Sequence, residues 1–237
     1  RVVDLLEERY AEFNGLNLCF ETREGILKHC SLETAKQLGA VAERFLQGKC
    51  TSLEGQLANL ADEIAYNNHD VDDGLRSGLI TLEQLMAVPL FANHLAQVQQ
   101  QYPHLDERRT THETIRRMIN TQVNDLIATT RSKIRQQGVQ TLEEVRDAPA
   151  LVGFSTAIHD QNKELKSFLY GNLYRHYRVM RMSAKAQRII TDLFHVFMGD
   201  KRLLPPQYKR QAEQGHARAV ADYIAGMTDR YAIREHR

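Results

Sequence analysis

Residues 52–75 read SLEGQLANLADEIAYNNHDVDDGL. Apolar side chains recur in this stretch at steps of three, four and seven residues, which is the period of one helix face. These positions are Leu53, Leu57, Leu60, Ile64, Val71 and Leu75. Asp62, Tyr66 and Asp70 are spaced by four residues, so they share a second face about half a turn away. Ser52 is of a type that commonly caps the start of a helix, so the stretch predicts a long amphipathic helix.

The charge of this predicted helix has one sign. No Lys or Arg occurs between Lys49 and Arg76, whereas the acidic residues there are Glu54, Asp62, Glu63, Asp70, Asp72 and Asp73. A helix that only faces water usually mixes signs, because opposite charges four residues apart contribute about 0.2–0.5 kcal/mol per pair. Two interpretations stay open. Either the carboxylates simply face water, or a bound cation or a basic element elsewhere neutralises them.

Metal binding by this helix alone would be weak. A stable site needs three or four protein ligands that converge on one point, and Asp62 supplies one. His69 and Asp70 are adjacent, so on a helix their side chains point about 100° apart and would not readily chelate one ion. Further histidines are scattered without metal-binding spacing, at His29, His94, His104, His112, His159 and His176. The sequence therefore does not contain a complete metal site.

The remainder of the chain is also predicted to be helical, because no stretch alternates long enough for a sheet. The expected helices cover about 1–13, 21–29, 32–47, 52–73, 81–101, 108–136, 160–173, 184–198 and 208–226. Helix starts are expected after Ser31, Ser52, Thr141 and Ser183, and connections at Pro103, Pro149 and Pro205–Pro206. No repeat of 20–50 residues is visible. The fold prediction is an irregular multi-helix bundle of the all-α class, as a single domain over residues 1–237.

Composition narrows the class of protein. The 237 residues are 42% hydrophobic and 26% charged with a net charge of +1, which excludes collagen, a disordered tail and a disulfide mini-protein. No apolar run approaches the roughly 20 residues of a membrane span. The three cysteines, Cys19, Cys30 and Cys50, lack a C-x-x-C spacing and favour a reducing cytoplasm. The chain has no initial Met and starts within an amphipathic pattern, so we expect it to begin mid-protein.

The near-zero net charge hides a split. Residues 163–237 contain 15 Lys or Arg against 7 Asp or Glu, a net of +8, while the remaining residues carry a net of −7. Five cations, spaced by three or four, would share one broad helix face: Arg175, Arg178, Arg181, Lys185 and Arg188. They would contact phosphates of a nucleotide or of nucleic acid, or pair with acids such as those of the Asp62 helix or at a subunit contact.

Four segments, in this order and with this spacing, are similar to the deoxyguanosine triphosphate triphosphohydrolase (dGTPase) family of HD-domain phosphohydrolases. They are FETREGILKH at 20–29, LADEIAYNNHDVDDG at 60–74, LKSFLYGNLYRH at 165–176 and DYIAGMTDRYA at 222–232. The resemblance spans nearly the whole chain. It implies an all-α HD-type fold and an enzyme that hydrolyses a deoxynucleoside triphosphate at the α-phosphorus, releasing the deoxynucleoside and inorganic triphosphate.

The resemblance also implies a divalent metal, Mg or Mn or another transition metal, whose bound water attacks the phosphorus. The family holds it with a His, then a His-Asp doublet, then a later Asp, and Asp62 matches that last Asp. The earlier ligands are expected upstream of Arg1, so we expect this chain alone to be inactive. His69-Asp70 follows the final Asp instead of preceding it and is therefore not the doublet.

Substrate-binding roles follow from the same resemblance. Tyr66 and Asp70 would face the sugar and its 3′-hydroxyl, and Lys166 would meet a phosphate. Tyr174 would lie by the base or sugar, with His176 two residues further on. The competing interpretations are an ordinary core aromatic for Tyr174 and a solvated surface lysine for Lys166.

The implied partners are a deoxynucleoside triphosphate, single-stranded DNA or a regulatory nucleotide, and further copies of the chain in a homo-oligomer. One alternative is a helical protein that binds nucleotides or single-stranded nucleic acid without its own catalysis. Another is an HD-type hydrolase of a signalling nucleotide. The latter is less favoured, because the placement of Tyr66 and Asp70 suits a deoxyribose.

Overall fold

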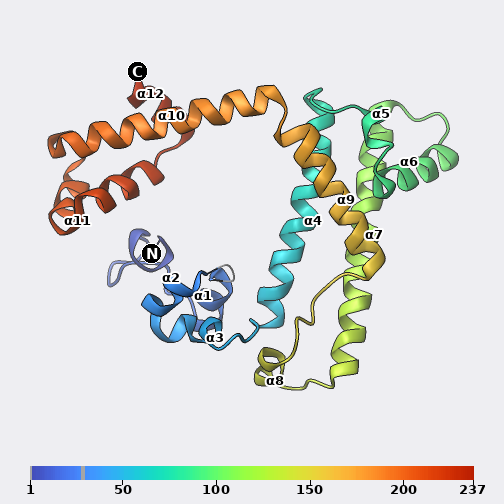
Figure 1. The fold of residues 1–237 in the computed structure, drawn as a ribbon, viewed down its shortest axis with the longest axis horizontal. Coiled ribbons are helices and arrows are strands. Elements are labelled where there is room, and N and C mark those ends of the chain that lie inside the picture. Colours follow the sequence, from blue (N-terminus) through green and yellow to red (C-terminus); the bar gives the residue numbers. More distant parts are fainter. Residues whose placement is uncertain (1, 28–29) are drawn as a thin grey trace. The chain divides into compact units, whose positions relative to one another are not determined.

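The computed structural model describes residues 2–27 and 30–237, and their secondary structure confirms the all-α class (Figure 1). The described residues contain no β-strand, only an isolated bridge between Glu8 and Gly15. The chain divides into two compact units, Arg1–Leu169 and Tyr170–Arg237. A single domain over residues 1–237 stays a prediction. Of the sequence motif at 20–29, Lys28 and His29 lie outside the described residues.

The first unit is centred on two long helices that pack side by side, α4 (Leu53–Arg76) and α7 (Glu107–Gln137) (Figure 1). The shorter α5 (Leu82–Leu85) precedes α6 (Pro89–Gln101), which packs on α7, and α9 (Thr156–Leu169) contacts both α4 and α6. Ile64, Leu126 and Val152 form a buried apolar cluster where α4 meets α7. This packing holds α4 as the central helix of the unit.

The N-terminal part of this unit is built from short helices. A π-helical turn η1 (Val2–Leu6) is followed by α1 (Phe20–Ile26), α2 (Leu32–Leu38), η2 (Gly39–Ala42) and α3 (Glu43–Leu46). A buried ion triad ties them to α8 (Leu142–Asp147). Glu24 lies with Oε1 2.8 Å from Arg44 Nε and Oε2 3.2 Å from Arg146 Nη2, and Arg44 Nη2 also donates to the Glu24 carbonyl. One carboxylate therefore joins α1, α3 and α8.

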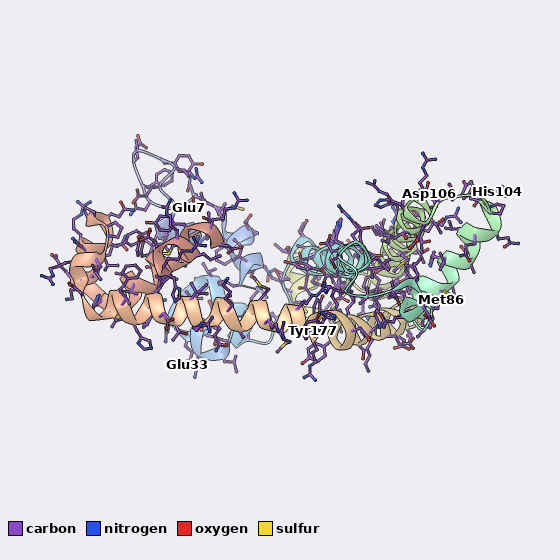
Figure 2. The ribbon with its side chains drawn as sticks, turned by 90° about the horizontal axis from the view of Figure 1, so that it is seen from above. Glu7, Glu33, Met86, His104, Asp106 and Tyr177 are labelled. Atoms are coloured by element: carbon purple, nitrogen blue, oxygen red, sulfur yellow. The ribbon has the colours of Figure 1, made fainter. Side chains whose placement is uncertain are left out.

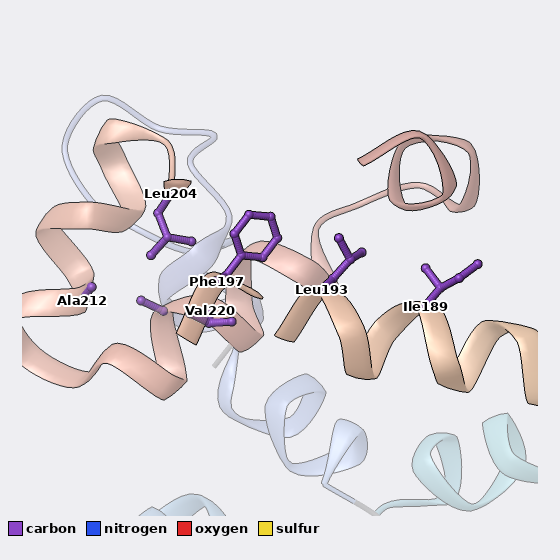
Figure 3. Packing of buried hydrophobic residues seen from close by; sticks show 7 residues of the cluster. Ile189, Leu193, Phe197, Leu204, Ala212 and Val220 are labelled. Atoms are coloured by element: carbon purple, nitrogen blue, oxygen red, sulfur yellow. The ribbon is translucent and has the colours of Figure 1, made fainter. Parts of the chain in front are cut away.

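The second unit is a small helical cluster. It contains the π-helical turn η3 (Tyr170–Tyr174), α10 (Tyr177–Gly199), η4 (Lys201–Leu203), α11 (Pro206–Ala225) and α12 (Asp229–His236). Ile189, Leu193 and Phe197 project from one side of α10 into a core completed by Leu204, Ala212, Ala219 and Val220 (Figure 3). Their spacing of four residues gives α10 a continuous apolar stripe.

Most predicted helices are confirmed, with boundary corrections that have local causes. The predicted helix at 52–73 runs from Leu53 to Arg76, and that at 108–136 from Glu107 to Gln137. The helix at 81–101 is interrupted because Pro89 lacks the N–H that would continue it and so begins α6. That at 32–47 breaks at Gly39, where φ is 62°. The helix expected at 208–226 is interrupted at Gly215 (φ 177°, ψ 93°).

Other predictions about helices were wrong. Among the described residues 2–13 of the predicted 1–13 helix, only Val2–Leu6 is helical, because a short amphipathic segment needs a surface on which to pack, and Val2 and Leu5 are exposed. Ser183 does not start a helix, since α10 already begins at Tyr177. The helix predicted at 160–173 starts earlier and ends earlier, as α9, and the π-helical turn η3 follows it. Helices α8 and α12 were not predicted, although Thr141 was identified as the start of α8.

Among the helices of the described residues, none combines the length and the apolarity that crossing a membrane requires.

The buried triad predicts a large effect of losing its carboxylate. Replacing Glu24→Ala leaves two arginines close together in a buried setting, so we expect a loss of about 3–5 kcal/mol in the free energy of unfolding. Urea denaturation of the chain measures this. The matched control is Glu21→Ala, an exposed carboxylate on the same helix, for which a change within about 0.5 kcal/mol is expected. Equal effects of the two variants would show that the triad does not stabilise the fold.

Candidate functional site

Helix α4 presents the predicted line of polar residues on its outer side. Its first turn is capped by Ser52, whose hydroxyl accepts a hydrogen bond from the Gly55 N–H at 3.2 Å. Asp62 is exposed, the Tyr66 side chain is 64% exposed, and Asp70 is partly buried. The predicted two-faced helix is therefore confirmed, whereas the binding roles of these residues stay predictions.

The inner side of α4 carries a directional polar contact as well as apolar packing. Asn68 and Gln122 are fully buried, and Gln122 Nε2 on α7 donates to Asn68 Oδ1 at 3.4 Å. Asn68 Nδ2 donates in turn to the Ile64 carbonyl at 2.7 Å, and Gln122 Nε2 to the Met118 carbonyl at 3.1 Å. Because buried amides must be hydrogen-bonded, this contact favours one rotation of α4 about its axis. That rotation turns the Asp62 line away from α7.

A cavity of about 720 Å³ lies where α1 meets the start of α4, and part of its lining consists of small residues. It is lined by Gly25 on α1 and by Glu54, Gly55 and Ala58 on α4, among others. Since Glu54, Ala58 and Asp62 are spaced by four residues, the cavity opens on the same line of α4 as Asp62. The small residues Gly55 and Ala58 thus line this cavity. Leu57, in contrast, is exposed and departs from the predicted apolar stripe.

Cations from outside the acidic stretch neutralise part of it. Lys166 on α9 lies with Nζ 2.7 Å from Glu63 Oε2, and Glu63 directly follows Asp62 in α4. Further along the helix, Asp72 Oδ2 is 3.5 Å from Arg76 Nη1, and Asp72 Oδ1 is 3.7 Å from His112 Nδ1. Of the two interpretations of the one-sided charge, neutralisation by a basic element elsewhere applies to Glu63, whereas Asp72 pairs with Arg76 at the end of α4 itself. The sequence did not indicate that Glu63 pairs with a lysine, because that partner lies about a hundred residues away along the chain.

The last two predicted site residues belong to the second unit. Tyr174 ends the π-helical turn η3 and its side chain is exposed. His176 caps α10, where its Nδ1 accepts a hydrogen bond from the Arg178 N–H at 3.3 Å, and its ring lies 4.7 Å from that of Tyr177. The interpretation of Tyr174 as an ordinary core aromatic is therefore wrong. The substrate contacts proposed for both residues stay predictions.

The basic residues of the same unit lie among exposed aromatic rings. Arg175 precedes α10 and donates to the Tyr170 hydroxyl at 3.0 Å with its guanidinium over the ring, while Arg178 and Arg181 lie over the Tyr177 ring. Tyr177 is labelled at the start of α10 in Figure 2. Arg175 is thus not part of the predicted helical stripe, which holds from Arg178 to Arg188. Within the described residues of this unit, none of these arginines pairs with a carboxylate.

The described residues do not form a metal centre by themselves. No three His, Cys, Asp or Glu side chains converge to hold an ion in the part of the chain that the structure describes. Asp62, exposed on α4, can offer one carboxylate to an ion whose remaining ligands come from elsewhere.

Comparison with known proteins gives two kinds of match. Residues 152–237 match the model of the phosphohydrolase-associated domain. The whole chain is 68% identical to a deoxyguanosinetriphosphate triphosphohydrolase-like protein of Bordetella pertussis, over 237 residues. Proteins with the same name from Thiobacillus denitrificans and Nitrosomonas europaea are 63% identical over 237 residues and 58% identical over 236 residues. Each match covers 100% of this chain, which spans 62 or 63% of the length of these relatives.

The match to the phosphohydrolase-associated domain supports a phosphohydrolase, and an all-α chain with this domain fits the HD-domain superfamily. Within that class, the resemblance to the dGTPase family that the four sequence motifs indicated is confirmed.

The buried amide pair under the site predicts a measurable loss of stability. Replacing Asn68→Ala removes the acceptor of Gln122 and leaves a buried amide donor with one partner fewer, so we expect the free energy of unfolding to fall by about 1–3 kcal/mol. Asn59→Ala is the control, because Asn59 lies on the same helix but is only partly buried. Chemical denaturation of both variants checks the difference. A loss no larger than that of the control would contradict a role for the pair in fixing α4.

Proposed function

We propose that this chain supplies the sugar- and phosphate-binding part of a metal-dependent deoxynucleoside triphosphohydrolase, which converts a dGTP-like nucleotide to the deoxynucleoside and inorganic triphosphate. The observation that carries the proposal is the outward line of Asp62, Tyr66 and Asp70 on α4, with Lys166 bound at the residue next to Asp62. The names of the relatives support the same reaction class. The chain is about three-fifths of their length, so the activity is proposed for the longer protein.

Each residue of the line offers a group that the substrate can use. The Tyr66 phenol stands largely exposed one helical turn beyond Asp62 and can stack on or hydrogen-bond a sugar. Asp70, another turn on, can accept a hydrogen bond from the 3′-hydroxyl. Tyr174 and His176 are proposed to border the base or sugar. The line spans eight residue steps, about 12 Å along the helix axis, so its two ends can contact different parts of one nucleotide.

Lys166 and Asp62 are proposed to serve the phosphate end. An ammonium group has three donors, and one of them is directed at Glu63, so two remain for phosphate oxygens. Asp62 would give one carboxylate oxygen to a divalent ion, Mg or Mn, whose other ligands lie outside this chain. When bound, such an ion polarises phosphoryl oxygens and makes water a usable nucleophile near neutral pH.

The test is product analysis in a protein that joins this chain to the further residues found in its relatives. With dGTP and Mg or Mn, we expect release of inorganic triphosphate, and Asp62→Ala should lower the rate by more than roughly a hundredfold. Asp73→Ala, an exposed carboxylate on the same helix, is the control and should change the rate by no more than about twofold. Pyrophosphate and monophosphate as products, or an active Asp62→Ala variant, would contradict the proposal.

A second candidate function rests on the second unit. No Asp or Glu occurs from residue 170 to 191, while the cations there are Arg175, Arg178, Arg181, Lys185 and Arg188. Tyr170 and Tyr177 are more than half exposed beside them. Aromatic faces that stack on bases, interleaved with cations that meet phosphates, are typical of surfaces for single-stranded nucleic acid. We propose such binding as an alternative to catalysis or alongside it.

This alternative predicts salt-dependent binding that maps to α10. Replacing Arg178, Arg181 and Arg188 by Gln should weaken binding of a single-stranded oligonucleotide and reduce the slope of log affinity against log salt by about 2. The control removes the same charge from exposed positions of α11, by Lys209→Gln, Arg210→Gln and Arg218→Gln. Fluorescence anisotropy at several salt concentrations makes the measurement. Equal losses in both variants, or binding that salt does not affect, would exclude α10 as the binding surface.

A further inference from the structure

The ion pair between Glu63 and Lys166 links the acidic helix to α9. Lys166 Nζ lies 2.7 Å from Glu63 Oε2, a short charge-assisted contact. The Glu63 side chain is 23% exposed and that of Lys166 is 48% exposed, so the carboxylate is the more buried partner. The contact therefore holds a mobile lysine at one place, beside the residue that follows Asp62.

Glu63 and Lys166 have no other oppositely charged partner among the neighbouring described residues on α4 and α9. One turn away from Glu63 on α4 stand Asn59, Leu60, Tyr66 and Asn67, none of which is a Lys, Arg or His. One turn before Lys166 on α9 stands Lys163, a like charge that makes a counter-ion for Lys166 more favourable. Among the described residues, neither Glu63 nor Lys166 forms another ion pair. The charge of Lys166 is thus balanced by a single carboxylate.

Such an arrangement affects how an anion can bind. A phosphate oxygen that approaches Lys166 meets an ammonium whose charge is already compensated, and it also meets the negative charge of Glu63. The highly charged triphosphate can replace one carboxylate at the ammonium, because it brings more negative charge to the same donors. Glu63, which is partly exposed, can then turn its carboxylate to water.

We propose that Glu63 is a positioning counter-ion for Lys166, which holds the ammonium against α4 beside Asp62 and is exchanged for a phosphate oxygen when a triphosphate binds. This inference rests on the phosphate-binding role given to Lys166 in the proposed function. The inference assigns a role to Glu63, which the phosphate-binding role of Lys166 alone does not. Glu63 lowers the affinity for the triphosphate and keeps the lysine in place between binding events.

The experiment measures binding of inorganic tripolyphosphate to the 237-residue chain by isothermal titration calorimetry at low salt. Glu63→Gln keeps the size of the side chain and removes its charge, so we expect roughly three- to tenfold tighter binding than in the unaltered chain. Lys166→Gln should bind more weakly than the unaltered chain. The double variant should bind no more tightly than Lys166→Gln, because the gain from Glu63→Gln requires the ammonium.

A control separates this exchange from a general loss of negative charge. Asp73→Asn removes one exposed carboxylate from the same helix and should bind tripolyphosphate within about twofold of the unaltered chain. If Glu63→Gln binds no more tightly than Asp73→Asn while Lys166→Gln binds weakly, the counter-ion inference is wrong and the role of Lys166 stands. If Lys166→Gln binds as well as the unaltered chain, or no variant binds, the phosphate role of Lys166 is wrong and the inference fails with it.

Discussion

The contact on which the candidate site most depends is the buried amide pair between Asn68 on α4 and Gln122 on α7. Apolar packing around Ile64, Leu126 and Val152 holds the two helices together, but it is not directional and tolerates small rotations. A buried hydrogen bond forms in one rotation only and leaves costly unpaired amides in the others. The position of the Asp62 line relative to the core follows from that constraint.

Electrostatics places a second constraint on α4. Helix α4 has six acids and, before its last residue Arg76, no Lys or Arg, and its ion pairs with Lys or Arg include one to Lys166 on α9 and one along its own surface to Arg76. Lys166 and His112 thereby become part of the surroundings of the α4 acids. At the start of the unit, the Glu24 carboxylate does the same for Arg44 and Arg146 in a more buried setting. In both places, charges that are remote in sequence join separate helices.

Local signals predicted the fold wherever the decisive group lies within a few residues. The hydroxyls of Ser31, Ser52 and Thr141 cap helices as expected, since capping uses backbone donors within three residues. The helix predicted at 1–13 failed because its apolar residues find no surface on which to pack. The start predicted at Ser183 failed because α10 already begins at Tyr177, where the His176 side chain caps the helix.

For the candidate site, the sequence by itself determined the helix, its four-residue line of Asp62, Tyr66 and Asp70, and the separation of that line from the apolar face. These follow from the 3.6-residue period of the α-helix, which places residues that are four apart in sequence on the same face. Only the tertiary structure decided that Lys166 meets Glu63, and that Asn68 meets Gln122 under the same helix. Such contacts depend on how helices pack across long sequence separations, and no spacing along the chain encodes that packing.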